Sequence, residues 1–156
     1  SWGCSNIDKL ISKYNLSDYI LLFPFCSEHL QQKKWPYYDQ LIKLIKQNHP
    51  NLKIVIAPGP DEIEKAKKLD AVSILKEDNA ISISELAGLI KRSKFVVAND
   101  TGPAHMAAHL NVKGLSLFGS HTTAHKVSIE REKFKAIQVS DLKNLSAEKV
   151  FERLVF

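Results

Sequence analysis

One stretch of this sequence restricts the possible folds more than any other. An apolar run at residues 95–98 leads into the polar turn 99–102, and Pro103 then suits the first turn of a helix. A second apolar run follows at residues 115–118. This order of elements predicts two parallel strands joined by a helical crossover. The start of such a helix offers unpaired N–H groups and the positive end of the helix dipole, so the stretch predicts an anion-binding site.

The rest of the chain repeats this alternation of strands and helices. The other apolar runs, expected as strands, lie at residues 19–23, 52–57, 72–75 and 136–139. Helical patterns or helix-start signals lie at residues 7–14, 35–45, 61–69, 82–90 and 146–154. Because the strands are apolar along their whole length, both faces of the sheet should be buried. We therefore expect an α/β fold, a Rossmann-like open parallel sheet with helices on both faces and ligands beyond the strands' carboxyl ends.

The length of 156 residues suits one domain with a real core. We expect residues 1–18 to be a lead-in segment with one short helix, and residues 19–156 to form that domain. The sequence begins Ser1-Trp2-Gly3 without a methionine, which we interpret as the start of a fragment of a longer chain.

The charge balance excludes some classes of partner. The 22 lysines and arginines exceed the 17 aspartates and glutamates by five, which suits an anionic ligand or simply a solvated basic surface. No arginine-rich tract or run of stacking aromatics is present, so nucleic acid is not an expected partner. No apolar run is long enough to span a bilayer, and no signal peptide is recognisable. Cys4 and Cys26 have neither redox-motif nor zinc spacing, which favours a reducing cytoplasm; Cys26 is a nucleophile or a bystander thiol.

Two polar loops come before the opening stretch and should share its edge of the sheet. The loop at residues 24–36 contains Lys33 and Lys34, and a lysine there either meets a phosphate or is solvated. The loop at residues 57–62 ends in Glu62, whose carboxylate either accepts the hydroxyls of a ribose or favours the dipole of the helix that follows.

The third loop is the polar turn of the opening stretch. Asp100 is too costly to bury unpaired, so it binds a ligand or caps the helix. Thr101 can cap the helix or bind phosphate, and Gly102 permits a close backbone approach or a positive φ. With Pro103 and His105 in the first helical turn, this combination is the strongest candidate site in the chain.

The motifs that are missing also narrow the function. The pair His105 and His109 lacks the glutamate of a zinc-protease helix, and no metal site is expected. Neither GxGxxG nor GxxxxGK[ST] occurs, which disfavours a dinucleotide dehydrogenase and a P-loop NTPase. Gly119 and Ser120 open a segment rich in hydroxyl groups, which is either a further phosphate or sugar contact or a polar surface loop.

Three motifs together resemble glycosyltransferase family 9, the bacterial ADP-heptose heptosyltransferases of lipopolysaccharide core assembly. The first is Asn99-Asp-Thr-Gly-Pro-Ala-His-Met-Ala-Ala108 with Leu117-Phe-Gly119. The others are Lys33-Lys-Trp-Pro36 and Pro58-Gly-Pro-Asp-Glu62. The sequence departs from the family pattern at Phe118-Gly-Ser-His-Thr122, at Pro24-Phe-Cys26 and near Ala80, where a glycine is missing. These departures bear on the identity of the sugar more than on the fold.

The resemblance implies the donor-binding half of a two-domain GT-B enzyme that inverts the anomeric centre of the sugar. Lys33 would contact the donor phosphates or sugar, Glu62 the adenosine ribose, and Asp100 the heptose hydroxyls. Lys33 and Asp100 would be the catalytic residues of this half. The other donor contacts would come from Thr101, Gly102, Pro103, His105, Gly119 and Ser120.

The same resemblance sets the expected partners. The donor would be ADP-heptose or a similar nucleotide sugar, used without a cofactor or metal. The acceptor would be lipopolysaccharide, held by an N-terminal domain that also carries the catalytic base and is absent from this chain. The expected location is the cytoplasm, with peripheral association at the inner face of the inner membrane. The alternatives are a Rossmann-like nucleotide-binding module without transferase activity and a GT-B enzyme that uses another nucleotide sugar.

Overall fold

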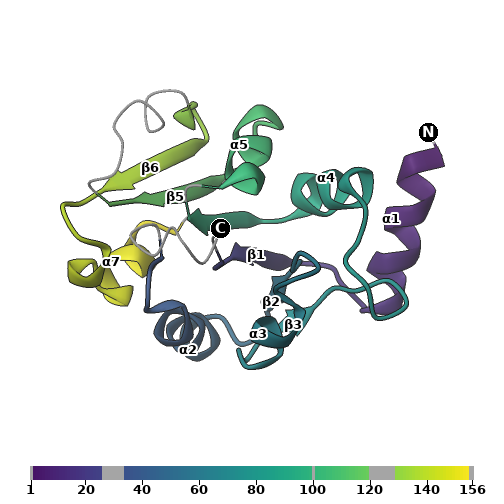
Figure 1. The fold of residues 1–156 in the computed structure, drawn as a ribbon, viewed down its shortest axis with the longest axis horizontal. Helices are drawn as coiled ribbons and strands as arrows, with labels where there is room; N and C mark the ends of the chain where they lie inside the picture. Colours follow the sequence, from purple (N-terminus) through teal and green to yellow (C-terminus); the bar gives the residue numbers. More distant parts are fainter. Residues whose placement is uncertain (1, 26–33, 100, 120–128, 155–156) are drawn as a thin grey trace.

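The computed structural model describes residues 2–25, 34–99, 101–119 and 129–154, and in these ranges it contains one sheet of six parallel strands. The strand order is β3-β2-β1-β4-β5-β6 (Figure 1). The strands are β1 (Tyr19–Phe23), β2 (Lys53–Ile56), β3 (Val72–Ser73), β4 (Phe95–Asn99), β5 (Gly114–Phe118) and β6 (Phe134–Gln138). The predicted α/β class and open parallel sheet are confirmed.

Helices cover both faces of this sheet, as predicted. The helices α1 (Trp2–Lys13), α4 (Ile83–Arg92) and α5 (Gly102–His109) lie on one face. The helices α2 (Tyr38–Asn48), α3 (Ile63–Lys67) and α7 (Ala147–Glu152), with the short 3₁₀ helix Leu142–Asn144, lie on the other (Figure 1). The helices that follow β1 and β2 therefore lie on one face of the sheet, and the helices on either side of β4 in the sequence lie on the other. The strand order reverses between β1 and β4.

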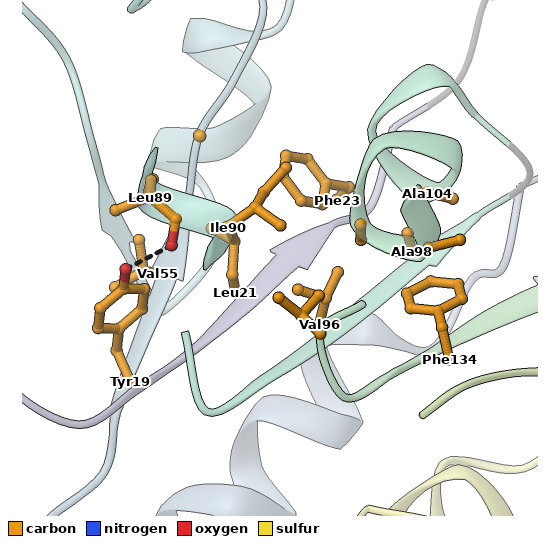
Figure 2. Packing of buried hydrophobic residues seen from close by; sticks show 14 of the residues in the cluster. Tyr19, Leu21, Phe23, Val55, Leu89, Ile90, Val96, Ala98, Ala104 and Phe134 are labelled. Carbon is orange, nitrogen blue, oxygen red and sulfur yellow. Dashed lines mark hydrogen bonds between the residues drawn. The ribbon is translucent and has the colours of Figure 1, made fainter. Parts of the chain in front are cut away.

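Side chains of the central strands alternate between two cores. In β1, Tyr19, Leu21 and Phe23 pack with Leu89 and Ile90 on the α4 side (Figure 2). The residues between them face the α2 and α7 side. Since successive strand residues point to opposite faces, a continuous apolar run fills both cores at once.

The first helix is longer than predicted and belongs to this core. It begins at Trp2 rather than near Ile7, and its side chains Ile7 and Leu10 are buried against α4. A Cβ atom on Gly88 would lie only 3.1 Å from the side chain of Ile7, so the glycine lets α1 approach α4 closely. Residues 1–18, expected as a lead-in, thus contribute buried apolar surface.

Two other helices, α2 and α3, also differ from the prediction. The helix expected to open at Trp35 begins at Tyr38, because Trp35 is buried and its indole N–H donates to the carbonyl of Leu145 at 2.8 Å. The helix expected over residues 61–69 spans only Ile63–Lys67.

The predicted capping residues of two helices, α4 and α7, are confirmed. In α4 the Ser82 hydroxyl accepts from the N–H of Glu85, and the Glu85 carboxylate accepts from the N–H of Ser82, which is the predicted capping box. The Ser146 hydroxyl likewise accepts from the N–H of Lys149 at the start of α7.

Candidate donor site

The polar loops gather at the carboxyl ends of four neighbouring strands. Since all the strands run in one direction, the segments that follow β2, β1, β4 and β5 emerge side by side at one edge. The centre of this edge, between β1 and β4, is the point where the strand order reverses. Ligands of open parallel sheets bind at such points.

The start of α5 is the most distinctive feature of this edge. Thr101 stands at the N-cap position with extended backbone, but its hydroxyl donates to the carbonyl of Asn99 at 3.3 Å and caps nothing. The carbonyl of Thr101 accepts the first helical bonds, from Ala104 at 3.1 Å and His105 at 3.3 Å. Within the described residues no side chain caps α5, so its positive end is open to an anion.

Gly102 and Pro103 begin this helix in the way expected of an anion site. The predicted position of Pro103 in the first turn is confirmed. Gly102 does not adopt a positive φ, which removes one of the two reasons expected for it. It is exposed, and a Cβ atom there would meet none of the described residues within 4 Å. Packing against the described residues therefore does not require glycine at this position.

The histidines of α5 differ in exposure. His105 is half-buried in the first helical turn, beside the open helix start. His109, which was expected to be a surface or packed residue, is exposed in the last turn.

Glu62 uses one carboxylate oxygen to close the turn before α3. Its Oε1 accepts from the N–H of Gly59 at 2.8 Å, while its own N–H donates to the carbonyl of Gly59 at 3.0 Å. These two bonds close the turn between β2 and α3. Among the described residues only one carboxylate oxygen of Glu62 has a hydrogen-bond partner, and the second can accept a hydroxyl from a ligand.

Gly119 is buried directly after β5. Its carbonyl accepts a long hydrogen bond of 3.5 Å from the side-chain amide of Gln138, the last residue of β6. Three predicted site residues, Lys33, Asp100 and Ser120, lie outside the described residues, as does Cys26.

Sequence reasoning gave no role to the residue that connects these loops. Asn99 is fully buried; its side-chain amide donates to the carbonyl of Pro24 at 3.0 Å, and its Oδ1 accepts from the hydroxyl of Tyr38 at 3.1 Å. Its backbone carbonyl accepts from the hydroxyl of Ser116 at 3.4 Å. The signal was present in the sequence, because a polar residue that ends an otherwise apolar strand needs partners.

Glu85 fixes the start of α4 near the same edge. Burial alone would raise the pKa of this carboxyl, but bonds from Ser82 and the ammonium of Lys76 outweigh it and hold the pKa below 4.5. The Lys76 Nζ lies 3.2 Å from Oε2 of Glu85. The buried negative charge of Glu85 is therefore balanced by Lys76 and serves the fold.

The described residues contain no group of three or more histidine, cysteine, aspartate or glutamate side chains that could hold a metal ion. None of the helices in this part of the chain is long and apolar enough to cross a membrane.

Comparison with known proteins identifies the family. The model of glycosyltransferase family 9 (heptosyltransferase) matches residues 6–154. The chain belongs to this family.

Individual members of family 9 are similar in sequence and in fold. Lipopolysaccharide heptosyltransferase 1 of Campylobacter coli is 32% identical over 100 residues, which are 58% of this chain and 29% of the relative. The E. coli heptosyltransferase WaaC has a TM-score of 0.73 and 24% identity over 86% of this chain and 42% of its own. E. coli ADP-heptose lps heptosyltransferase II has a TM-score of 0.75 and 19% identity, and the match covers 95% of this chain and 49% of that protein. The chain thus spans less than half the length of each.

Proposed function

We propose that this chain is the donor-binding half of a glycosyltransferase that moves heptose, or a related sugar, from ADP to a lipopolysaccharide acceptor. The observation that carries the proposal is the start of α5 at the switch point of the sheet, which no side chain of the described residues caps, in a chain of family 9. The solved WaaC structure, which shares this fold, is one with ADP.

The open helix start would bind the diphosphate. The departing ADP gains negative charge as the glycosidic bond breaks, and fixed N–H dipoles aimed at that charge stabilise the transition state. Lys33 would add a cation to the phosphates. Thr101 and Gly102 would let the diphosphate approach the backbone, with Pro103, His105, Gly119 and Ser120 around it.

The carboxylates would select the rest of the donor. Glu62 would accept the ribose hydroxyls through the oxygen that its turn leaves unused. Asp100 would accept the sugar hydroxyls. A site built to pair a carboxylate with hydroxyls rejects a sugar that leaves the carboxylate unpaired.

Transfer would require more than this chain. We place the acceptor site and the catalytic base on a further domain, and the inversion at the anomeric carbon follows from direct displacement by the acceptor hydroxyl. No metal is assigned a role. The cytoplasm, at the inner face of the inner membrane, is the proposed location.

Calorimetric titration of the chain tests the proposal. ADP and ADP-heptose should bind, and UDP should bind more weakly. Asp100→Ala should weaken ADP-heptose more than ADP, and Lys33→Ala should weaken both. Lys34→Ala is the matched control, because it removes an equal charge from the neighbouring exposed position. If no nucleotide or nucleotide sugar binds, the proposal fails; preference for UDP would assign another donor.

A further inference from the structure

Asn99 is a buried polar residue whose side-chain nitrogen and oxygen both have hydrogen-bond partners. It is the last residue of β4 and has no exposed surface. Its amide nitrogen donates to Pro24 and its amide oxygen accepts from Tyr38. Since an unpaired buried amide is costly, these two bonds hold all three groups in one arrangement.

The bond to Pro24 connects β1 and β4 beyond their backbone ladder. The parallel pairing of the two strands ends where Phe23 lies beside Ala98. The next residue of β4, Asn99, donates through its side chain to the carbonyl of Pro24, the next residue after β1. The connection between the two strands is thereby extended by one residue, although proline has no N–H with which to donate a ladder bond of its own.

Pro24 and Tyr38 are the two ends of one segment. Pro24 directly follows β1, and Tyr38 is the first residue of α2, so the segment between them contains Lys33. Asn99 directly precedes Asp100, and its carbonyl also accepts from the hydroxyl of Thr101. One residue therefore contacts both ends of the Lys33 segment and the start of the α5 turn.

We propose that Asn99, with Tyr38, is a positioning residue that holds Pro24, at the end of β1, and the first residue of α2 in a fixed position relative to the diphosphate-binding start of α5. This inference rests on the proposed function, since it concerns the same donor site. Asn99 itself has no surface for a ligand to touch. It acts through the backbone and through residues on both sides of the switch point.

The test measures the affinity for ADP by calorimetry at a temperature where every variant is folded. Tyr38→Phe and Asn99→Leu should each weaken ADP binding by about three- to tenfold, because the start of α5 is no longer held in its binding position; the lost bonds themselves lower the stability of the fold. The double variant should bind about as weakly as Asn99→Leu alone, because both changes break one network.

Tyr19→Phe is the matched control. Like Tyr38→Phe, it deletes one buried hydroxyl. The Tyr19 hydroxyl donates to the backbone carbonyl of Leu89, at the opposite end of β1 from Pro24 (Figure 2). Tyr19→Phe should lower the melting temperature as Tyr38→Phe does and leave ADP affinity unchanged. The inference is overturned if Tyr38→Phe and Asn99→Leu bind ADP like the wild type, or if Tyr19→Phe weakens binding equally. Absence of ADP binding by the wild type would instead refute the proposed function.

Discussion

At the scale of single residues, Glu62 shows how one side chain serves both fold and ligand. One oxygen closes the turn with Gly59, which any acceptor of the same shape could do. The proposed contact with ribose hydroxyls needs the negative charge of the other oxygen. Structure and binding can therefore be separated by a change that keeps the shape and removes the charge.

Glu62→Gln should keep the turn and weaken ADP binding by about three- to tenfold, the range of a lost charge-assisted hydrogen bond. Calorimetry measures the affinity, and urea unfolding checks that stability changes little. Glu64→Gln is the control, because Glu64 is exposed on the same helix and pairs only with Lys67 in the described structure. Equal ADP affinities for wild type and Glu62→Gln would contradict the role of Glu62.

Glu85 gives a prediction about pH. Its folded pKa is lowered, so it contributes stability above its unfolded pKa, and that contribution is lost as pH falls through the folded value. Glu85→Gln should therefore lower the unfolding free energy at pH 7 by about 1 kcal/mol, the net worth of a hydrogen bond. The difference from wild type should shrink as the pH falls from the ordinary pKa of a glutamate through the lower folded pKa of Glu85, where the folded carboxyl becomes protonated. Urea unfolding measured from pH 7 downward in steps, for as long as both proteins fold, gives the difference at each pH; a difference that stays constant over the whole series would contradict the argument.

At the scale of elements, α5 and β5 each begin with a glycine, and the two positions differ in the space that a larger side chain would have. Gly114 begins β5, and a Cβ atom there would lie 2.5 Å from the ring of Phe134 and 2.8 Å from the carbonyl of Val96. A Cβ atom on Gly102, which begins α5, would meet none of the described residues. The first glycine is required by packing, and the second is proposed to let the diphosphate approach the backbone.

The variants Gly114→Ala and Gly102→Ala should therefore separate stability from binding. Gly114→Ala should cost about 1–3 kcal/mol of unfolding free energy through overpacking. Gly102→Ala should leave stability within about 0.5 kcal/mol, as surface changes usually do, and weaken ADP binding. Chemical unfolding and calorimetry on both variants give the comparison. A Gly102→Ala variant that binds ADP normally would show that the diphosphate does not approach this position.

At the scale of the whole molecule, the sequence predicted the parallel sheet because its strands are apolar on both faces. The start of α5 was predictable because the preference of proline for the first helical turn acts locally. The extent of α1 was not, because burial of Ile7 depends on its contact with α4. The role of Asn99 was missed for the same reason, since its partners Pro24 and Tyr38 are 75 and 61 residues away in the chain.

Amide chemical shifts of the labelled chain, followed as ADP is added, test the central claim most directly. ADP should shift the N–H signals of Gly102 and Ala104 at the start of α5, together with Glu62 and Gly59, all at the carboxyl edge of the sheet. Lys113 and Lys133, which precede β5 and β6 at the opposite edge, should not shift. Shifts confined to that opposite edge, or none at all at saturating ADP, would contradict the account.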